Sequence, residues 1–337
     1  MKKFLVLLII ISTFALGSEL HISFTGNNRG LLTPCGCKIP SGGWPRISTV
    51  LDNMPGFALH IGAGNHFFHH TPMPKEDQIF EQKKAAFQAE LFSELKYDVI
   101  NAGQYDLCYG LKVLRSLQSN FDLPIISANI LDMNGDLVFT PYKIIRSQNI
   151  DIMFIGICSL SDGFNYRIKD PLLALEELYR EGLFEQADLV ILLADAPAVI
   201  LSDFVKEHSG IDLIVCAKEH AITGLPVHYK GTALTQLGSQ GKYIGDLYLN
   251  FDGNATEWKD ISPYRYSIKA AEIALNSKTD HRKKYLKQLK RSRKILKTEI
   301  KNNPSYYQWD MLLLDRSVKD DREIKKRVDK FTPYPDP

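Results

Sequence analysis

The start of the sequence lacks a hydrophobic run long enough to cross a membrane. Residues 4–16 are apolar and follow Lys2 and Lys3, but they are too few for a stable membrane-spanning helix. A basic start, a short apolar segment and small residues at 15 and 17 are typical of a signal peptide. We therefore predict a signal peptide over residues 1–17, cleaved before Ser18, with a retained anchor as the alternative.

The sequence also lacks an excess of charge of either sign. Its 41 Lys and Arg residues nearly balance 39 Asp and Glu residues, which leaves a net charge of +2. The molecule as a whole therefore has no strong attraction to nucleic acid or to an anionic membrane. No cysteine that could be lipidated follows the predicted cleavage site. We expect a periplasmic or secreted protein with no nucleic-acid partner and no stable membrane anchor after signal cleavage.

Cysteine is scarce, and the absence of a C-x-x-C-H motif removes the sequence argument for a covalently attached haem. The five cysteines are an odd number, so in an exported protein at least one stays free or pairs elsewhere. Two of them, Cys35 and Cys37, flank a single glycine.

What the sequence does have is the composition and the alternation of a globular α/β protein. Hydrophobic residues make up 45% of the chain and charged residues 24%. Short β-branched runs predict strands at residues 20–25, 58–61, 99–101, 125–128, 152–157, 189–193 and 213–216. Apolar spacings of three and four predict helices at 76–95 and 172–184. This order predicts a layered α/β fold whose chemistry lies beyond the strand ends.

The composition shifts near residue 266, where we divide a main domain of residues 18–266 from a basic helical C-terminal extension of residues 267–337. Residues 267–301 are rich in Lys and Arg and predict one long basic helix that Pro304 closes. An apolar segment at 306–314 and a short charged helix at 320–330 follow. A basic helix can bind nucleic acid or a membrane surface, but a solvated face on a docked helix is the more frequent case.

Seven blocks of the sequence resemble, in the same order, the metallophosphoesterase domain of 5'-nucleotidases, which belongs to the calcineurin-like superfamily. They begin with the strand and loop of residues 20–30 and the Gly-Gly-Trp-Pro-Arg turn of 42–46. The remaining blocks are residues 62–65, 97–111, 124–129 with 141–143, 210–220 and 241–247. The resemblance implies a four-layer αββα sandwich. It also implies two divalent cations that bridge a phosphate ester and activate a water molecule.

Carried over position by position, the resemblance places few of the expected ligands in this chain. The metal-ligand positions hold Asn27, Arg29, Asn65, Asp195, Lys218 and His220. The positions of the catalytic Asn-His pair and of the Glu after it hold Gln104, Tyr105 and Asp106. We therefore retain Asn27, Asn65, Asp195 and His220 as metal-ligand candidates, and Arg29 and Lys218 as anion-binding candidates.

The charge of this aligned set disfavours a pair of dications. Arg29, Asp195 and Lys218 together sum to +1 with His220 neutral, where two carboxylates would give −2. Unit charges about 4 Å apart interact by roughly 4 kcal/mol at an effective dielectric constant of 20, and a dication doubles that energy. We therefore expect that the protein has no metal cofactor. If it is an active phosphoesterase, we expect the metal to be Mn, Zn or Fe.

Two groups of residues offer other chemistry in the same loops. His66, His69 and His70 could supply imidazole ligands, although exposed histidines without such a role are more frequent. Cys35, Cys37, Cys108 and Cys216 could form a soft thiolate site with His220, or two of them a disulfide. Cys158 lies in a run of residues with the pattern of a strand, so we expect its side chain to be part of the hydrophobic core.

Three functions remain open on the amino-acid sequence alone. The first is an exported metallophosphoesterase-like protein with weak or no hydrolase activity that binds a phosphate-like anion or a partner protein. The second is an active metal-dependent phosphoesterase with a rebuilt site that includes His66, Asp106, Asp195 and His220. The third is a redox or cytochrome-associated module that acts through the loop of Cys35 and Cys37.

Overall fold

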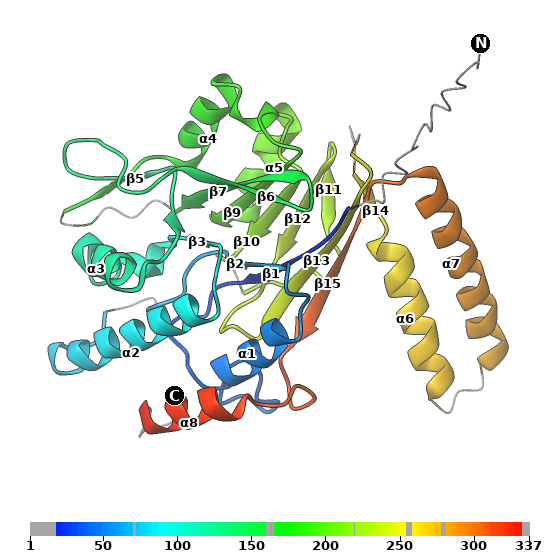
Figure 1. The fold of residues 1–337 in the computed structure, drawn as a ribbon, viewed down its shortest axis with the longest axis horizontal. Helices are drawn as coiled ribbons and strands as arrows, with labels where there is room; N and C mark the ends of the chain where they lie inside the picture. The colour runs from blue at the N-terminus through cyan, green and yellow to red at the C-terminus, as the bar shows by residue number, and fades with distance from the viewer. Residues whose placement is uncertain are drawn as a thin grey trace, which may run out of the picture.

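The computed structural model describes residues 18–69, 72–159, 163, 165–218, 220–253, 258–277 and 281–331 (Figure 1). The predicted signal peptide and His70 lie outside them. Among the described helices, none combines the length and the hydrophobicity that a bilayer span requires.

Two sheets form the centre of the molecule. The first has seven strands in the order β14-β15-β13-β1-β2-β3-β4, namely β14 (Lys259–Asp260), β15 (Tyr306–Leu313), β13 (Tyr243–Phe251), β1 (Ser18–Thr25), β2 (Leu59–Gly62), β3 (Val99–Asn101) and β4 (Ile125–Ile126). The second has six in the order β11-β12-β10-β9-β7-β6, namely β11 (Val227–Tyr229), β12 (Thr232–Gln236), β10 (Leu213–Cys216), β9 (Leu189–Asp195), β7 (Ile150–Cys158) and β6 (Tyr142–Ser147). A small pair, β5 (Ile130–Leu131) and β8 (Arg167–Ile168), lies beside them.

The strand side chains alternate between two buried environments, which explains why most of these strands read as continuous apolar runs. On β7, Ile152 and Phe154 join the core between the two sheets, together with Phe24 of β1. Met153 and Ile155 of the same strand point to the opposite face and join the core under the helices. The period of two along a strand produces this division.

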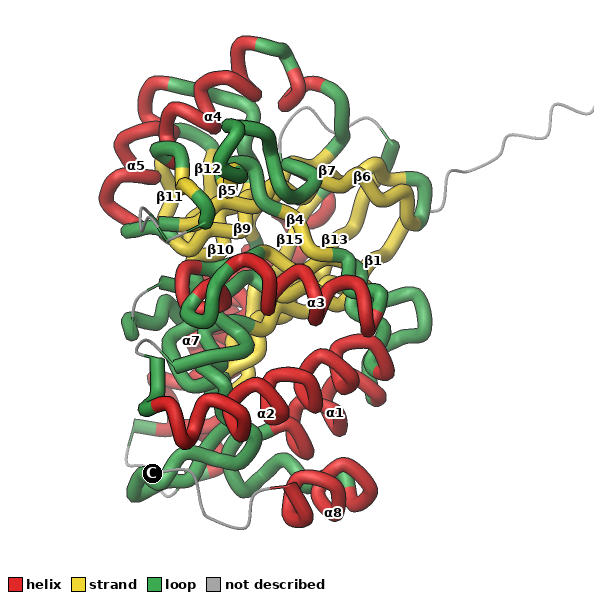
Figure 2. The backbone as a smooth tube through the Cα atoms, turned by 90° about the vertical axis from the view of Figure 1, so that its left-hand side faces the viewer, coloured by secondary structure: helices red, strands yellow, loops and turns green. Residues whose placement is uncertain are grey.

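Helices cover the outer face of each sheet (Figure 2). The core on the first sheet includes residues of α1 (Trp44–Asp52), α2 (Lys75–Glu94), α3 (Leu111–Phe121) and α8 (Arg322–Phe331). The core on the second sheet includes residues of α4 (Pro171–Arg180), the short η2 (Leu183–Glu185) and α5 (Ala198–Glu207). The order of layers is helix, sheet, sheet, helix, so the predicted αββα sandwich is confirmed.

The C-terminal part differs from its prediction in two respects. The basic region forms two helices, α6 (Ser262–Asn276) and α7 (Arg282–Asn302), where one long helix was predicted. The apolar segment that follows is β15, which pairs antiparallel with β13 inside the first sheet. Alternation explains the strand, because Tyr307 and Trp309 are buried while Gln308 and Asp310 are partly exposed. The predicted boundary at residue 266 falls within α6, whereas the predicted charged helix at 320–330 is confirmed as α8.

β15 should be needed for the stability of the whole sandwich. The Trp309 side chain is 2% exposed, and its ring lies 5.7 Å from that of Phe24 in the core between the sheets. Trp309→Ala should therefore lower the free energy of unfolding by about 3–5 kcal/mol in urea titrations. Leu312→Ala is the matched control, because Leu312 lies on the same strand with 40% exposure. Equal, small effects of the two substitutions would mean that β15 contributes little to the core.

Candidate functional site

Loops after five strands bring the predicted site residues together at one end of the sandwich. Asn27 and Arg29 follow β1, Asn65 follows β2, and Gln104 follows β3 in the short helix η1 (Gln104–Leu107). Asp195 ends β9, and Lys218 and His220 follow β10. These loops lie at the carboxyl ends of parallel strands, where open α/β sheets place their ligand sites. We call these residues with Tyr105 the strand-end cluster.

Asp195 is the carboxylate at the centre of the cluster, and it is 0% exposed. Its Oδ1 accepts a hydrogen bond from Asn65 Nδ2 at 2.8 Å, and its Oδ2 accepts one from the backbone N–H of Gln104 at 2.6 Å. Asn65 also donates to the carbonyl of Ala217 at 3.1 Å and accepts the backbone N–H of Tyr105 at 2.9 Å. Both ends of the Asn65 amide are thus occupied by protein partners.

Lys218 supplies the positive charge beside Asp195. Its Nζ lies 3.7 Å from Asp195 Oδ1 and donates to Gln104 Oε1 at 2.6 Å. Burial raises the pKa of the Asp195 carboxyl, while the charge of Lys218 and hydrogen bonds from Gln104 and Asn65 oppose that shift. The ammonium therefore partly offsets the cost of a buried carboxylate at this position.

Arg29 is the second cation of the cluster, and its partners are neutral. Its Nε donates to Asn27 Oδ1 at 2.8 Å, and one terminal nitrogen lies 3.4 Å from Nε2 of His220. The guanidinium carbon lies 5.2 Å from the ring centroid of Tyr105. Within the described part of the chain, no carboxylate forms an ion pair with Arg29. The side chain is partly exposed, and the partners it contacts among the described residues do not neutralise its charge.

The backbone of these loops adopts conformations that non-glycine residues rarely use. Asn27, Arg29 and Asn65 have φ angles of 54°, 56° and 58°, in the left-handed region. The N–H of Asn27 donates to the carbonyl of Gly64 at 2.8 Å, and that of Arg29 donates to Asn65 at 3.0 Å. The first two loops are therefore hydrogen-bonded to each other, and strained backbone of this kind clusters at functional sites.

Asp106 lies behind the cluster and holds the loops in place. Its Oδ1 accepts the backbone N–H groups of His66 and Phe67, and its Oδ2 accepts those of Asn65 and Gly103, at distances of 2.7–3.0 Å. Burial raises the pKa of this carboxyl to about 6, against the opposing effect of the backbone donors. Asp106 is buried, so its role is to position the loop after β2 and the start of η1.

The two loop histidines that the structure describes, His66 and His69, do not form a ligand group. His66 was expected to be an exposed loop residue, and this is wrong. It is fully buried, its ring lies 4.9 Å from that of Phe92, and its Nε2 accepts the N–H of Gly64. Burial lowers the pKa of His66 to about 3, so its ring stays neutral at physiological pH. His69 is exposed, and His70 is outside the described residues.

The five cysteines all lie within the described residues, form no disulfide and have different surroundings. Cys216 and Cys158 are buried strand residues. Cys108 donates to the carbonyl of His69, and burial raises its pKa to about 12. For Cys35, burial works against ionisation, but hydrogen bonds from Cys37 and Ser41 with the charge of Lys242 lower the pKa overall. Cys35 and Cys37 therefore form the pair best suited to thiol chemistry, because the pKa of Cys35 is lowered and Cys37 is exposed.

The residues of the strand-end cluster do not fit a pair of bound dications. The Asn65 amide and both Asp195 oxygens are engaged by protein donors, and the cluster itself contains two cations. Across the described ranges, no three His, Cys, Asp or Glu side chains are grouped so as to hold a metal ion. Adding cations here would require the protein cations to move away and the buried hydrogen bonds to break.

Sequence reasoning missed one loop that completes the cluster. The carbonyl of Gly238 accepts from Asn27 Nδ2 at 2.7 Å, and Ser239 Oγ lies 2.8 Å from Nδ1 of His220. Gly238 has a φ of 75°, and it begins the sequence Gly-Ser-Gln-Gly, which lies just before β13. The two glycines between β12 and β13 are the sequence signal that could have predicted this loop.

Comparison with solved structures identifies the fold. The 5'-nucleotidase precursor of Thermus thermophilus matches with a TM-score of 0.66 and 15% identity, over 94% of this chain and 58% of that one. The calcineurin-like phosphoesterase YfkN of Bacillus subtilis matches with a TM-score of 0.62 and 16% identity, over 93% and 96%. This chain has the 5'-nucleotidase-type metallophosphoesterase fold. The fold that the seven sequence blocks imply is thereby confirmed.

Sequence comparison agrees with this metallophosphoesterase assignment but covers less of the chain. The trifunctional nucleotide phosphoesterase protein YfkN of Bacillus subtilis (strain 168) is 23% identical over 236 residues. The match covers 58% of this chain and 16% of that protein, so this chain spans a small part of its length. No family model matches the sequence. The assignment at these identities is one of fold.

Asp106 offers a sharp test of how this metallophosphoesterase fold holds its loops. Each carboxylate oxygen accepts two backbone N–H groups, so the NH₂ of an asparagine would face two donors whichever way its amide turned. We expect Asp106→Asn to cost more than about 3 kcal/mol in unfolding free energy, because buried donors lose their acceptor. Asp136→Asn, at an exposed position, is the control and should change stability by less than about 0.5 kcal/mol. A near-neutral Asp106→Asn would contradict this role.

Proposed function

We propose that the mature protein is an exported metallophosphoesterase-fold protein that binds a small oxyanion at the strand-end cluster without hydrolysing phosphate esters. The observation that carries the proposal is Arg29, a partly exposed guanidinium with only neutral partners in the described residues. A planar pair of N–H donors matches two oxygens of a phosphate, sulfate or carboxylate.

The two cations of the cluster differ in how far their charge is already compensated. Lys218 is 21% exposed and lies beside the buried carboxylate of Asp195, so it serves mainly to neutralise that group. Arg29 has no such partner among the described residues. Both cations lie over the ring of Tyr105, at 5.2 and 5.7 Å from its centroid. Arg29 is therefore the principal anion contact, and Lys218 adds a point charge nearby.

The absence of hydrolysis follows from the donor set. A two-cation phosphoesterase needs free carboxylate and imidazole ligands to hold the metals that generate its nucleophile. In the cluster the Asp195 oxygens and the Asn65 amide are hydrogen-bonded, and His220 is bonded between Ser239 and Arg29. An active site rebuilt around His66 would also require that buried ring to leave its core position.

Export is part of the proposal because residues 1–17 have the pattern of a signal peptide. The bound ligand would then be a periplasmic or extracellular anion. A partner protein that presents a carboxylate or phosphate to Arg29 satisfies the same chemistry.

A second candidate function is thiol redox chemistry at Cys35 and Cys37. The specific observation is the Cys35-Gly36-Cys37 loop, in which Cys37 is exposed, Cys35 is buried, and the neighbouring Cys37 side chain helps to lower the pKa of the Cys35 thiol. A low-pKa thiol beside an accessible second thiol is the arrangement of dithiol redox sites. A Cys35–Cys37 disulfide that forms and reduces with the ambient redox potential would distinguish this function from anion binding.

Purified protein should contain well under one equivalent of Mn, Zn or Fe by elemental analysis, and it should hydrolyse p-nitrophenyl phosphate no faster than buffer. The reason is that the cluster's own cations and hydrogen bonds occupy the ligand positions. Protein refolded with each metal serves as the control for loss during purification. Two bound metals per chain, with turnover abolished by His220→Ala, would establish an active phosphoesterase.

Binding of an oxyanion should raise the melting temperature. Ligand at about a hundred times its Kd stabilises the native state by roughly 2.7 kcal/mol, which is readily seen in a thermal scan. We expect a higher melting temperature in millimolar phosphate or sulfate than in chloride of equal ionic strength, and loss of this difference in Arg29→Gln. Lys112→Gln, at an exposed position on α3, is the matched control. A shift that survives in Arg29→Gln would place the anion elsewhere.

A further inference from the structure

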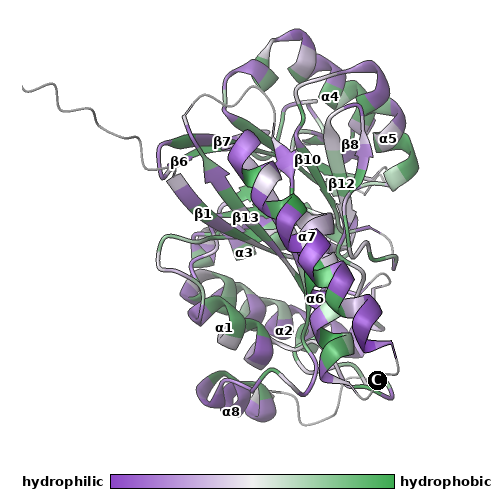
Figure 3. Ribbon diagram, turned by 90° about the vertical axis from the view of Figure 1, so that its right-hand side faces the viewer, coloured by the Kyte–Doolittle hydropathy of each residue, from purple (hydrophilic) through white to green (hydrophobic). Residues whose placement is uncertain are grey.

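The α6 and α7 helices form a hairpin at one side of the molecule. They pack against each other, and α6 also contacts β15. In Figure 1 the hairpin stands to the right of the sheets, and in Figure 3 α7 lies on the outside with a mostly hydrophilic surface. The side of α7 that contacts α6 includes buried Ser292 and Leu296. The rest of its circumference faces away from the protein.

The outer surface of α7 has a very uneven charge. The helix holds ten Lys and Arg residues, all exposed, and a single acid, Glu299. Arg293 pairs with Glu272 of α6, and Glu299 pairs with Lys259 rather than with a residue of its own helix. The helix has a net charge of +9 and the whole chain +2, so all other residues together sum to −7. The net charge of the chain is therefore near zero although positive charge is concentrated on α7 and the remaining residues are net negative.

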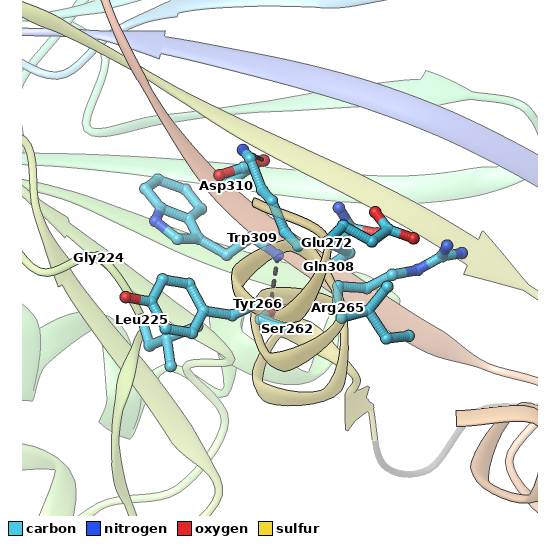
Figure 4. A pocket seen from close by; sticks show the side chains of 11 residues that line it. Gly224, Leu225, Ser262, Arg265, Tyr266, Glu272, Gln308, Trp309 and Asp310 are labelled. Carbon is cyan, nitrogen blue, oxygen red and sulfur yellow. Dashed lines mark hydrogen bonds and ion pairs between the residues drawn. The ribbon is translucent and has the colours of Figure 1, made fainter. Parts of the chain in front are cut away.

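Apolar surface accompanies these cations. A groove of about 470 Å³ runs between the two helices, with three apolar residues along it, three cations and one acid: Ile268, Leu296 and Ile300; Arg265, Arg293 and Lys297; and Glu272. Figure 4 shows Arg265 and Glu272 on α6 beside a second cavity, of about 210 Å³, between this helix and β15. Near the connection of the helices, Ile273 is 64% exposed and Leu286 39%.

We propose that the α6–α7 hairpin docks the protein reversibly on the surface of an anionic phospholipid bilayer. Cations along a helix of 21 residues, about 31 Å long, match a laterally continuous array of lipid phosphates. The groove between the helices has apolar walls that the acyl chain of a lipid can contact. The cations beside it can bind the phosphate of the same lipid. Exposed Ile273 and Leu286 enter the interface as the apolar side chains of other peripheral helices do.

Neither nucleic acid nor an acidic protein accounts for these features as well. A duplex offers phosphates but no apolar group for the groove or for Ile273 and Leu286. Proteins that bind single strands stack aromatic side chains on the bases. Among its ten cations α7 has one aromatic residue, Tyr285, and that side chain is partly buried. The docking surface is separate from the strand-end cluster and does not depend on its function.

The experiment is co-sedimentation of the purified protein with vesicles. Vesicles of phosphatidylglycerol mixed with phosphatidylcholine should bind the protein, and vesicles of phosphatidylcholine alone should not. Each basic residue at an anionic surface contributes about a fivefold gain in binding. Four such contributions multiply, so the variant with Lys283, Lys287, Lys290 and Lys294 changed to Gln should bind several hundredfold more weakly, about 600-fold if they are independent. Ile273→Ser with Leu286→Ser should weaken binding less.

The control removes the same charge from another surface, with Lys319, Lys325, Lys326 and Lys330 changed to Gln on and before α8. This variant should retain wild-type vesicle binding if the location of the charge matters. Unchanged melting temperatures confirm that each variant is folded. The proposal is overturned by equal binding to neutral vesicles, by equal loss in both quadruple variants, or by tighter binding to duplex DNA or poly-glutamate than to anionic vesicles.

Discussion

The hydrogen bonds and the ion pair of the buried Asp195 carboxylate are what the rest of the site depends on. This group lies where β9 ends, between the two sheets. It accepts hydrogen bonds from Asn65 after β2 and from Gln104 after β3, and it forms an ion pair with Lys218 after β10. An unpaired carboxylate at 0% exposure would cost several kcal/mol. The loops are therefore held together by the need to satisfy one charge.

This arrangement changes what a metallophosphoesterase fold can do. In the two-cation mechanism that the fold resemblance implies, metal ions would offset the negative charge of ligands and substrate. Here a lysine ammonium and an asparagine amide meet the carboxylate from within the protein. Arg29 is left with neutral partners among the described residues and a positive charge, which suits recognition of an anion more than activation of water.

The sequence was sufficient for the fold and for most members of the cluster because both depend on order along the chain. β-branched runs that end in glycine or polar residues mark parallel strands, and their carboxyl ends must meet at one edge. The resemblance of the seven blocks to the metallophosphoesterase domain then assigned Arg29, Asn65 and Lys218 to one site before their contacts were known. The burial of His66 was not predictable, because a loop histidine becomes a core residue only when α2 supplies Phe92 against it.

Tertiary pairing also explains what was missed after residue 266. Residues 306–313 could be recognised from the sequence only as an apolar segment. One strand of an antiparallel pair has no local signature beyond the alternation of its side chains. Their partner β13 lies more than fifty residues earlier in the chain. Likewise, the charge of α7 is visible in the sequence, but the groove that accompanies it exists only once α6 packs beside it.

A double-mutant cycle between Lys218 and Asp195 tests the central claim most directly. The measurement is the unfolding free energy of the wild type, Lys218→Met, Asp195→Asn and the double variant. If Lys218 replaces external cations at this carboxylate, Lys218→Met should be strongly destabilising alone and nearly neutral beside Asp195→Asn, with a coupling energy of about 1–3 kcal/mol. Additive effects, with no coupling, would show that the lysine does not compensate the buried charge and would contradict the account.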